Sequence, residues 1–230
     1  MKPYERLAEA TAPDGTVLLL YRHDGAYLIR VNGIELMSTR RSHSEEQLAA
    51  LACAPLRSRP DASVLIAGLG FGFTLKAALR LLPSDARMVV AEIVREVIEW
   101  NRNPDYPLAS AALLDKRVDL RNDDVANVLR DNVAAFDAIM LDVDNGADPL
   151  TTSGNARLYD DAGIRIAMAA LRPGGTLAYW SAQNDPTFVK ALERAGLIVD
   201  VQRSRAHATS GGFCSLFIAT QRDRTRASTR

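Results

Sequence analysis

Short apolar runs separated by turn residues open the chain and predict β-hairpins. The runs are rich in β-branched, aromatic and aliphatic side chains, which favour strands, and they cover Val17–Tyr21, Tyr27–Val31 and Ile34–Met37. Between them stand His23-Asp24-Gly25 and Asn32-Gly33, residue types that tolerate the positive φ angles of a tight turn. This part of the chain is therefore expected to form a small antiparallel sheet.

From Asp61 onward, short apolar runs alternate with longer stretches of helical pattern. Runs such as Val64–Ala67 lack polar alternation, as is typical of strands buried on both faces of a parallel sheet. A turn at Gly211-Gly212 joins the last two strands, so the final strand should be antiparallel. The pattern predicts an α/β fold, a Rossmann-like seven-stranded sheet that resembles the methyltransferase type, with a small N-terminal β-hairpin domain. Strands are predicted at Ser63–Ala67, Met88–Glu92, Val118–Arg121, Ala138–Asp142, Thr176–Trp180, Leu197–Val201 and Ser215–Thr220, and helices at about 73–82, 94–101, 123–131, 159–171 and 186–195.

Turn and linker residues divide the chain into four predicted parts. Residues 1–43 form the hairpin domain, and residues 61–221 form the Rossmann-like domain. Residues 44–60 are expected to be a helix and a linker, because Ser44 and Gln47 resemble a capping box that opens a helix, and Pro55 follows it. Residues 222–230 form a charged tail.

The balance of charge argues against nucleic acid or an anionic membrane as a partner. The chain has 28 Lys plus Arg and 28 Asp plus Glu, which gives a formal net charge of zero. No apolar run has the length of a membrane-spanning helix, and the first residues lack the apolar core of a signal peptide. Cys53 and Cys214 have no metal-ligand spacing, so no metal is expected, and a cytoplasmic location is the simplest interpretation.

A glycine loop follows the first strand of the predicted parallel sheet. Gly68, Gly70 and Gly72 stand between a buried strand and a helix, where glycine lets the backbone turn tightly and approach a ligand. Glu92 ends the next strand, about twenty residues on, where a carboxylate accepts the hydroxyl hydrogens of a ribose. The alternative is a tight strand–helix turn beside an ordinary surface glutamate. Because the loop, the strand and the acid agree in position, we favour a nucleoside site.

Carboxylates also follow the third and fourth strands. Asp123 and Asp124 stand where a carboxylate would accept from an adenine amino group, and Asp124 is the preferred residue. The alternative is a cap on the next helix. Asp142 and Asp144 follow the fourth strand, where two carboxylates would hold a cation or act as a base toward an amine. For these residues, with Asn145, the alternative is an Asx-rich turn.

A few further side chains are expected near the strand ends. Tyr159 and Gln183 are candidate substrate contacts, and the polar loop from Asp148 to Asn155 would form a lid. Trp180 is interpreted as a core residue, and His43 as part of a solvated basic loop rather than an acid–base group.

Together these residues resemble the spermidine synthase (polyamine aminopropyltransferase) family. The resemblance rests on the Gly68–Gly72 loop, on Glu92, and on Asp124 and Asp142, with Leu158-Tyr159 and Arg172-Pro173-Gly174-Gly175 as later landmarks. It implies a transferase that uses S-adenosylmethionine or its decarboxylated form as co-substrate and alkylates a small-molecule acceptor, an amine by preference. It also implies that Asp142 is catalytic. The oligomeric state is left open, and a homodimer is one alternative, since the N-terminal hairpins offer a sheet that can extend across two copies of the chain.

Two residues depart from the family's pattern. Phe71 stands where the family's glycine loop carries an aspartate, and Asn145 replaces the second aspartate after the fourth strand. Both changes remove negative charge where a polyamine would bind, so spermidine synthesis itself is not expected. A methyltransferase and a non-catalytic nucleoside-binding relative are therefore the alternatives to an aminopropyltransferase-like enzyme.

Overall fold

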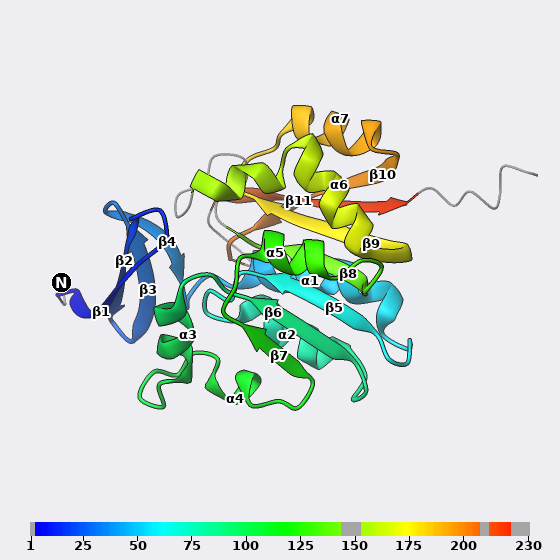
Figure 1. The fold of residues 1–230 in the computed structure, drawn as a ribbon. Coiled ribbons are helices and arrows are strands. Elements are labelled where there is room, and N and C mark those ends of the chain that lie inside the picture. The colour runs from blue at the N-terminus through cyan, green and yellow to red at the C-terminus, as the bar shows by residue number, and fades with distance from the viewer. Residues whose placement is uncertain (1–2, 144–152, 208–211, 222–230) are drawn as a thin grey trace, which may run out of the picture.

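Two β-sheets form the frame of the protein (Figure 1). The computed structural model describes residues 3–143, 153–207 and 212–221. The smaller sheet is antiparallel, with the strand order β1-β2-β3-β4, and the larger sheet has the order β10-β11-β9-β8-β5-β6-β7. The small sheet contains β1 (Glu5–Thr11), β2 (Val17–His23), β3 (Ala26–Val31) and β4 (Ile34–Ser38). The large sheet contains β5 (Ser63–Ala67), β6 (Arg87–Ala91), β7 (Val118–Arg121), β8 (Phe136–Leu141), β9 (Leu171–Ser181), β10 (Leu197–Arg205) and β11 (Phe213–Gln221).

The predicted α/β architecture is confirmed in both sheets. Strands β5 to β9 pair in parallel, while β11 pairs antiparallel with β9 and with β10. All five side chains of β5 and all six of β8 are buried, which explains why their sequences show no polar alternation. The final strand is antiparallel, as the turn before it predicts, because a hairpin reverses the chain direction.

The hairpin turns of the small sheet follow the predicted turn residues. Asp24 and Gly25 have φ angles of 48° and 77°, and Asn32 and Gly33 have φ angles of 51° and 78°. Strand β1 was not among the predicted strands. It lies at the edge of the small sheet and, among the described residues, pairs with β2 alone. Of its seven residues only Ala10 is buried, so its sequence carries little apolar signal.

Helices cover both faces of the large sheet. Helices α5, α6 and α7 pack on one face, around Leu129, Ile164 and Leu192, and α1, α2 and α4 pack on the other, around Leu48 and Leu75. The helices are α1 (His43–Cys53), α2 (Phe73–Leu81), α3 (Arg95–Arg102), α4 (Ser110–Leu113), α5 (Val125–Asp131), α6 (Asp161–Ala170) and α7 (Pro186–Arg194), with 3₁₀ turns η1 (Ala54–Leu56) and η2 (Ser153–Leu158). The short helix α4 was not predicted.

One predicted helix cap is wrong, and two predicted helices differ from the structure at their first residue. Helix α1 begins at His43 rather than after Ser44, and the Ser44 hydroxyl donates to Glu45 at 2.5 Å instead of capping the helix. The helix predicted at 159–171 begins only at Asp161. Asp160 caps it by accepting from the backbone N–H groups of Ala162 and Gly163, so the preceding residues lie outside it.

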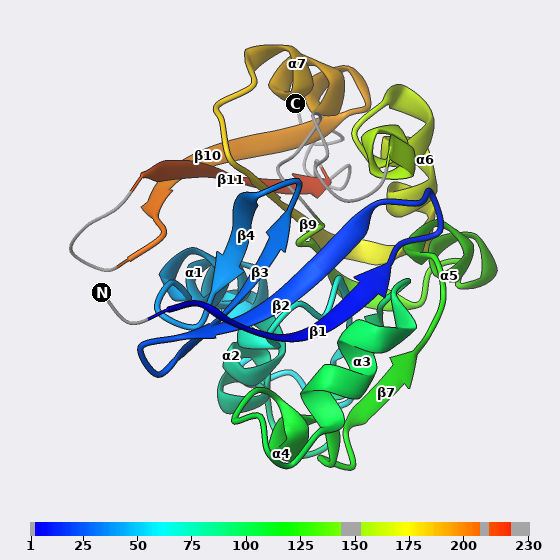
Figure 2. The ribbon, with the colours of Figure 1, turned by 90° about the vertical axis from the view of Figure 1, so that its left-hand side faces the viewer.

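The small sheet packs against the carboxyl end of the large one (Figure 2). Leu18 and Ile29 of the small sheet share a hydrophobic cluster with Phe71 of the glycine loop and with Val97 and Trp100 of α3. The small sheet therefore lies over the loops that follow β5 and β6, where the nucleoside site is expected. The domain bounds drawn from the sequence stay a prediction, and the tail at 222–230 lies outside the described residues.

Candidate functional site

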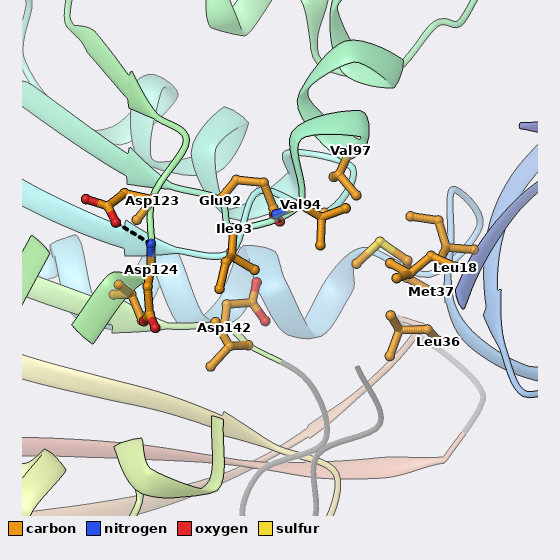
Figure 3. Close-up of a pocket in the computed structure, with 16 residues that line it drawn as sticks. Leu18, Leu36, Met37, Glu92, Ile93, Val94, Val97, Asp123, Asp124 and Asp142 are labelled. Carbon is orange, nitrogen blue, oxygen red and sulfur yellow. Dashed lines mark hydrogen bonds between the residues drawn. The ribbon is translucent and has the colours of Figure 1, made fainter. Parts of the chain in front are cut away.

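A cavity lies between the small sheet and the carboxyl ends of β5, β6 and β8 (Figure 3). Its carboxylates follow the strands of the large sheet, and apolar side chains of β2, β3 and β4 line the opposite side together with Val97 of α3. The described residues that line it include the apolar side chains of Leu18, Ile29, Leu36, Met37 and Val97 and the carboxylates of Glu92, Asp123, Asp124 and Asp142. Gly68 and Gly70 also line it, so the structure brings the glycine loop and the predicted carboxylates together.

The backbone conformation of the glycine loop brings it close to the end of β8. Gly68, Gly70 and Gly72 all have positive φ angles, of 84°, 50° and 70°. A Cβ atom on Gly68 would lie 2.5 Å from the backbone oxygen of Asp142, so no larger residue fits there without moving a strand end. The Asn101 side-chain amide donates to the backbone oxygen of Gly70 at 2.7 Å and fixes the loop from α3.

Glu92 ties the glycine loop to the end of β6. One carboxylate oxygen accepts from the backbone N–H of Leu69 at 2.9 Å, and the other accepts from Val94 at 2.8 Å. The residue is only 8% exposed, yet it lines the cavity. Each oxygen of an ionised carboxylate accepts more than one hydrogen bond, so this arrangement is compatible with an additional hydroxyl donor in the cavity.

Asp123 and Asp124 line the cavity at the start of α5, and both also accept hydrogen bonds from backbone N–H groups. Asp124 caps the helix by accepting from Ala126 at 2.8 Å, and its other oxygen pairs with Arg157 of η2. Asp123 accepts from the backbone N–H of Asp124 at 2.7 Å, the bond drawn in Figure 3, and from the side chain of Asn127 at 2.9 Å. The cap proposed as the alternative for Asp124 is therefore present, and it coexists with a place in the cavity wall.

Asp142 stands directly after β8, and its surroundings shift its pKa strongly. Burial raises its pKa to about 6, and a 2.6 Å hydrogen bond from the Thr74 hydroxyl opposes that rise. A second carboxylate, Glu45 of α1, has its pKa raised to about 7 by burial and by the negative charge of Asp142. A carboxyl that titrates near neutral pH is suited to accept a proton there.

The remaining predicted contacts lie elsewhere. The Tyr159 ring is in the core beside Tyr179 and Phe188, and its hydroxyl donates to the backbone oxygen of Trp180 at 3.1 Å. Gln183 lines a separate, open groove with Cys214. Asp144 and Asn145 lie outside the described residues, as does most of the lid predicted from Asp148 to Asn155.

Sequence reasoning missed Thr74 and the role of Glu45 in the surroundings of Asp142. Thr74 could have been placed near the site from the sequence, since it lies in the first turn of the helix that follows the glycine loop. The position of Glu45 could not, because α1 is far from β8 in sequence. Among the residues that the structure describes, no group of three His, Cys, Asp or Glu side chains is placed to hold a metal ion. Within the same residues, no helix combines the length and apolar character needed to cross a membrane.

Curated proteins similar to this chain include polyamine aminopropyltransferases. The chain is 28% identical over 152 residues to a polyamine aminopropyltransferase of Leptospira biflexa, a match that covers 66% of this chain and 51% of that protein. It is 33% identical over 102 residues to a polyamine aminopropyltransferase of Saccharolobus solfataricus, covering 44% of this chain and 33% of that protein. The first of these matches thus spans about half the length of the curated relative, and the second about a third.

Solved structures share the fold. Spermidine synthase from Thermotoga maritima superposes with a TM-score of 0.72 at 18% identity, over 95% of this chain and 73% of that one. A probable spermidine synthase from Corynebacterium glutamicum gives a TM-score of 0.65 at 16% identity, over 96% of this chain and 81% of that one. The family model described as the spermine/spermidine synthase domain matches residues 46–204. This match spans more than half of the chain and confirms the resemblance carried by the glycine loop and the carboxylates. The protein therefore belongs to the spermine/spermidine synthase domain family.

Proposed function

We propose that this protein is a transferase that binds S-adenosylmethionine or its decarboxylated form in the cavity and alkylates a small amine. One observation carries the proposal: the glycine loop, Glu92 and Asp142 line a single cavity at the carboxyl ends of parallel strands. A solved spermidine synthase structure with a TM-score of 0.70 is a complex with the transition state analogue AdoDATO, which supports the same class of ligand.

In this proposal the nucleoside lies along the cavity from Asp123 and Asp124 to Asp142. Glu92 accepts from the ribose hydroxyls while its backbone bonds hold it in place. The adenine amino group donates to Asp123 or Asp124, whose carboxylates line the same wall. The side chains of Leu18, Leu36 and Met37 exclude water from the opposite side.

Asp142 would act on the acceptor. The nitrogen lone pair forms a bond to a carbon next to the donor's sulfonium, and the carbon–sulfur bond breaks with its electron pair going to sulfur. The leaving group is a neutral thioether, so positioning and removal of the acceptor's proton are the main demands on the protein. Asp142 orients the amine and accepts that proton, for which a pKa of about 6 is well placed.

Methyl transfer is the second candidate reaction, and Phe71 favours it. Its side chain is 1% exposed and lies in the cluster beneath the small sheet, so this position supplies no carboxylate for the amine of a decarboxylated donor. Intact S-adenosylmethionine carries its own carboxylate and is less affected by that loss. We expect spermidine formation from putrescine to be weak.

The test begins with binding. Titration calorimetry with methylthioadenosine and S-adenosylhomocysteine should show binding, and Glu92→Ala should weaken it by roughly 1–3 kcal/mol, the usual value of charge-assisted hydrogen bonds. Mass spectrometry then follows methylthioadenosine or S-adenosylhomocysteine release from each donor with a mixture of amines. If the protein binds neither nucleoside, the proposed function is wrong. If it binds them but releases neither product, it is a non-catalytic relative.

A further inference from the structure

A second groove lies between α7 and the hairpin of β10 and β11. Helix α7 packs against β10 (Figure 1), and the groove is lined by these two elements, by β11 and by the loop that joins β9 to α7. No residue that the structure describes lines both this groove and the nucleoside cavity. Ser215 of β11 pairs with Ser181, the last residue of β9, so the groove lies at the carboxyl end of the parallel strands.

Strand register places two arginines and a phenylalanine on one face of the hairpin. Arg203 of β10 pairs with Ser215, and Arg205 pairs with Phe213. Side chains alternate along a strand, so Arg203, Arg205 and Phe213 lie on the same face as Phe217, which is buried in the cluster under α7. The guanidinium carbons of Arg203 and Arg205 lie 3.4 and 4.2 Å from the centroid of the Phe213 ring. The ring is 42% exposed, so it holds both cations at the surface rather than burying them.

Positive charge exceeds negative charge around this groove. Lys190 of α7 lines it together with Arg203, and Glu193 is the acid among the described lining residues. Within the part of the chain that the structure describes, neither arginine of the hairpin nor Lys190 has an ion pair with a carboxylate. Two like charges held on one ring repel each other, so an anion that binds between them is stabilised. Asp185 beside the groove is occupied by the backbone N–H groups at the start of α7.

An apolar wall lies beside these cations. Pro186 and Val189 of α7 line it, and Val201 of β10 faces them and is 39% exposed. A ligand that covers this wall needs an apolar body next to its anionic group. A phosphate ester carries a charge of about −1.5 to −2 at pH 7 and three acceptor oxygens, enough for two arginine forks and a lysine. A carboxylate offers one charge and two oxygens, so it satisfies fewer of these donors.

We propose that this groove binds a small organic phosphate ester. The phosphate lies between Arg203, Arg205 and Lys190, and the apolar body of the ester lies against Val189 and Val201. Binding involves ion pairs and apolar contact alone, and no bond is made or broken. The inference does not depend on the proposed transferase activity, because the groove shares no described residue with the nucleoside cavity.

Calorimetry with phenyl phosphate as the probe tests the inference. Phenyl phosphate should bind with the same affinity whether or not the protein is saturated with methylthioadenosine. Benzyl alcohol, which has the ring without the phosphate, and inorganic phosphate, which has no apolar body, should each bind at least about tenfold more weakly. Arg203→Gln and Arg205→Gln should each weaken phenyl phosphate by about tenfold, as loss of a charge-assisted hydrogen bond does. Arg87→Gln removes the same charge from the exposed first residue of β6 and should stay within about twofold.

NMR of the arginine side chains locates the probe. The Nε–H signals of Arg203 and Arg205, assigned by their loss in the two variants, should shift when phenyl phosphate is added. No binding of phenyl phosphate, unchanged affinity in both variants, or displacement by methylthioadenosine overturns the inference. Inorganic phosphate or benzyl alcohol that binds as tightly as the ester also overturns it. If methylthioadenosine does not bind, the proposed function has failed, and the two arginine variants still decide whether this groove binds the ester.

Discussion

Replacing Asp142 by asparagine should make the stability of the protein less dependent on pH. The substitution keeps the shape of the side chain, and its amide oxygen still accepts from Thr74. It removes an ionisation that the fold disfavours, because burial raises the pKa of Asp142 from its ordinary value of 3.8 to about 6. The folded protein therefore binds this proton more tightly than the unfolded chain does.

The sign and size of the effect follow from that difference in pKa. The stability from the protonated carboxyl is fully present below pH 3.8 and is lost as the pH rises through about 6. At about 1.4 kcal/mol for each tenfold change, ionisation costs the natural protein about 3 kcal/mol by pH 7.5, and about 1 kcal/mol of this already at pH 4.5. Asp142→Asn avoids this cost, so its stability relative to the natural protein should rise by about 2 kcal/mol over that interval.

Urea unfolding at pH 4.5 and at pH 7.5 measures this change. Asp131→Asn, at the exposed end of α5, is the control and should keep a constant difference from the natural protein. The charges of Glu45 and Asp142 interact, so the comparison is repeated in proteins that carry Glu45→Gln. There the stability gain of Asp142→Asn between pH 4.5 and pH 7.5 should be smaller. A difference between Asp142→Asn and the natural protein that stays constant within about 0.5 kcal/mol would show that Asp142 ionises at little cost, and our account of its burial would be wrong.

Three further predictions concern the same region. Asp142→Asn should lower turnover at least about tenfold with any accepted amine while nucleoside affinity, measured by calorimetry, changes little, and unchanged turnover would leave Asp142 a turn residue. Thr74→Val removes the bond that lowers the pKa of Asp142, so the carbon-13 titration of that carboxyl should shift to higher pH; a shift to lower pH contradicts the assignment. Gly68→Ala should destabilise the protein more than Gly70→Ala in urea unfolding. The new Cβ meets a backbone oxygen at 2.5 Å in the first case and the flexible end of Met37 at 2.5 Å in the second, so equal losses would refute the reasoning.

The sequence alone determined the elements whose conformation depends on residues close together in the chain. A hairpin was predicted at Asn32-Gly33 because both residue types adopt positive φ angles easily, and their φ angles are 51° and 78°. The unbroken apolar runs of β5 and β8 predicted burial on both faces. The closeness of the glycine loop and Glu92 in one cavity wall could be predicted, because the geometry of one strand–helix–strand unit fixes their separation.

The tertiary structure decided what depends on residues distant in sequence. Strand β1 is fixed by pairing with β2 and not by its own composition, and the apolar wall of the cavity exists only because the small sheet packs over β5 and β6. Tyr159 looked like a substrate contact but lies in the core, where it packs against Tyr179 of β9 and Phe188 of α7. The pKa of Glu45 is raised to about 7 by burial and by the negative charge of Asp142, an effect that exists only because α1 packs against β8. No periodicity within either segment encodes such a contact, because burial and charge–charge interaction depend on distance in space rather than along the chain.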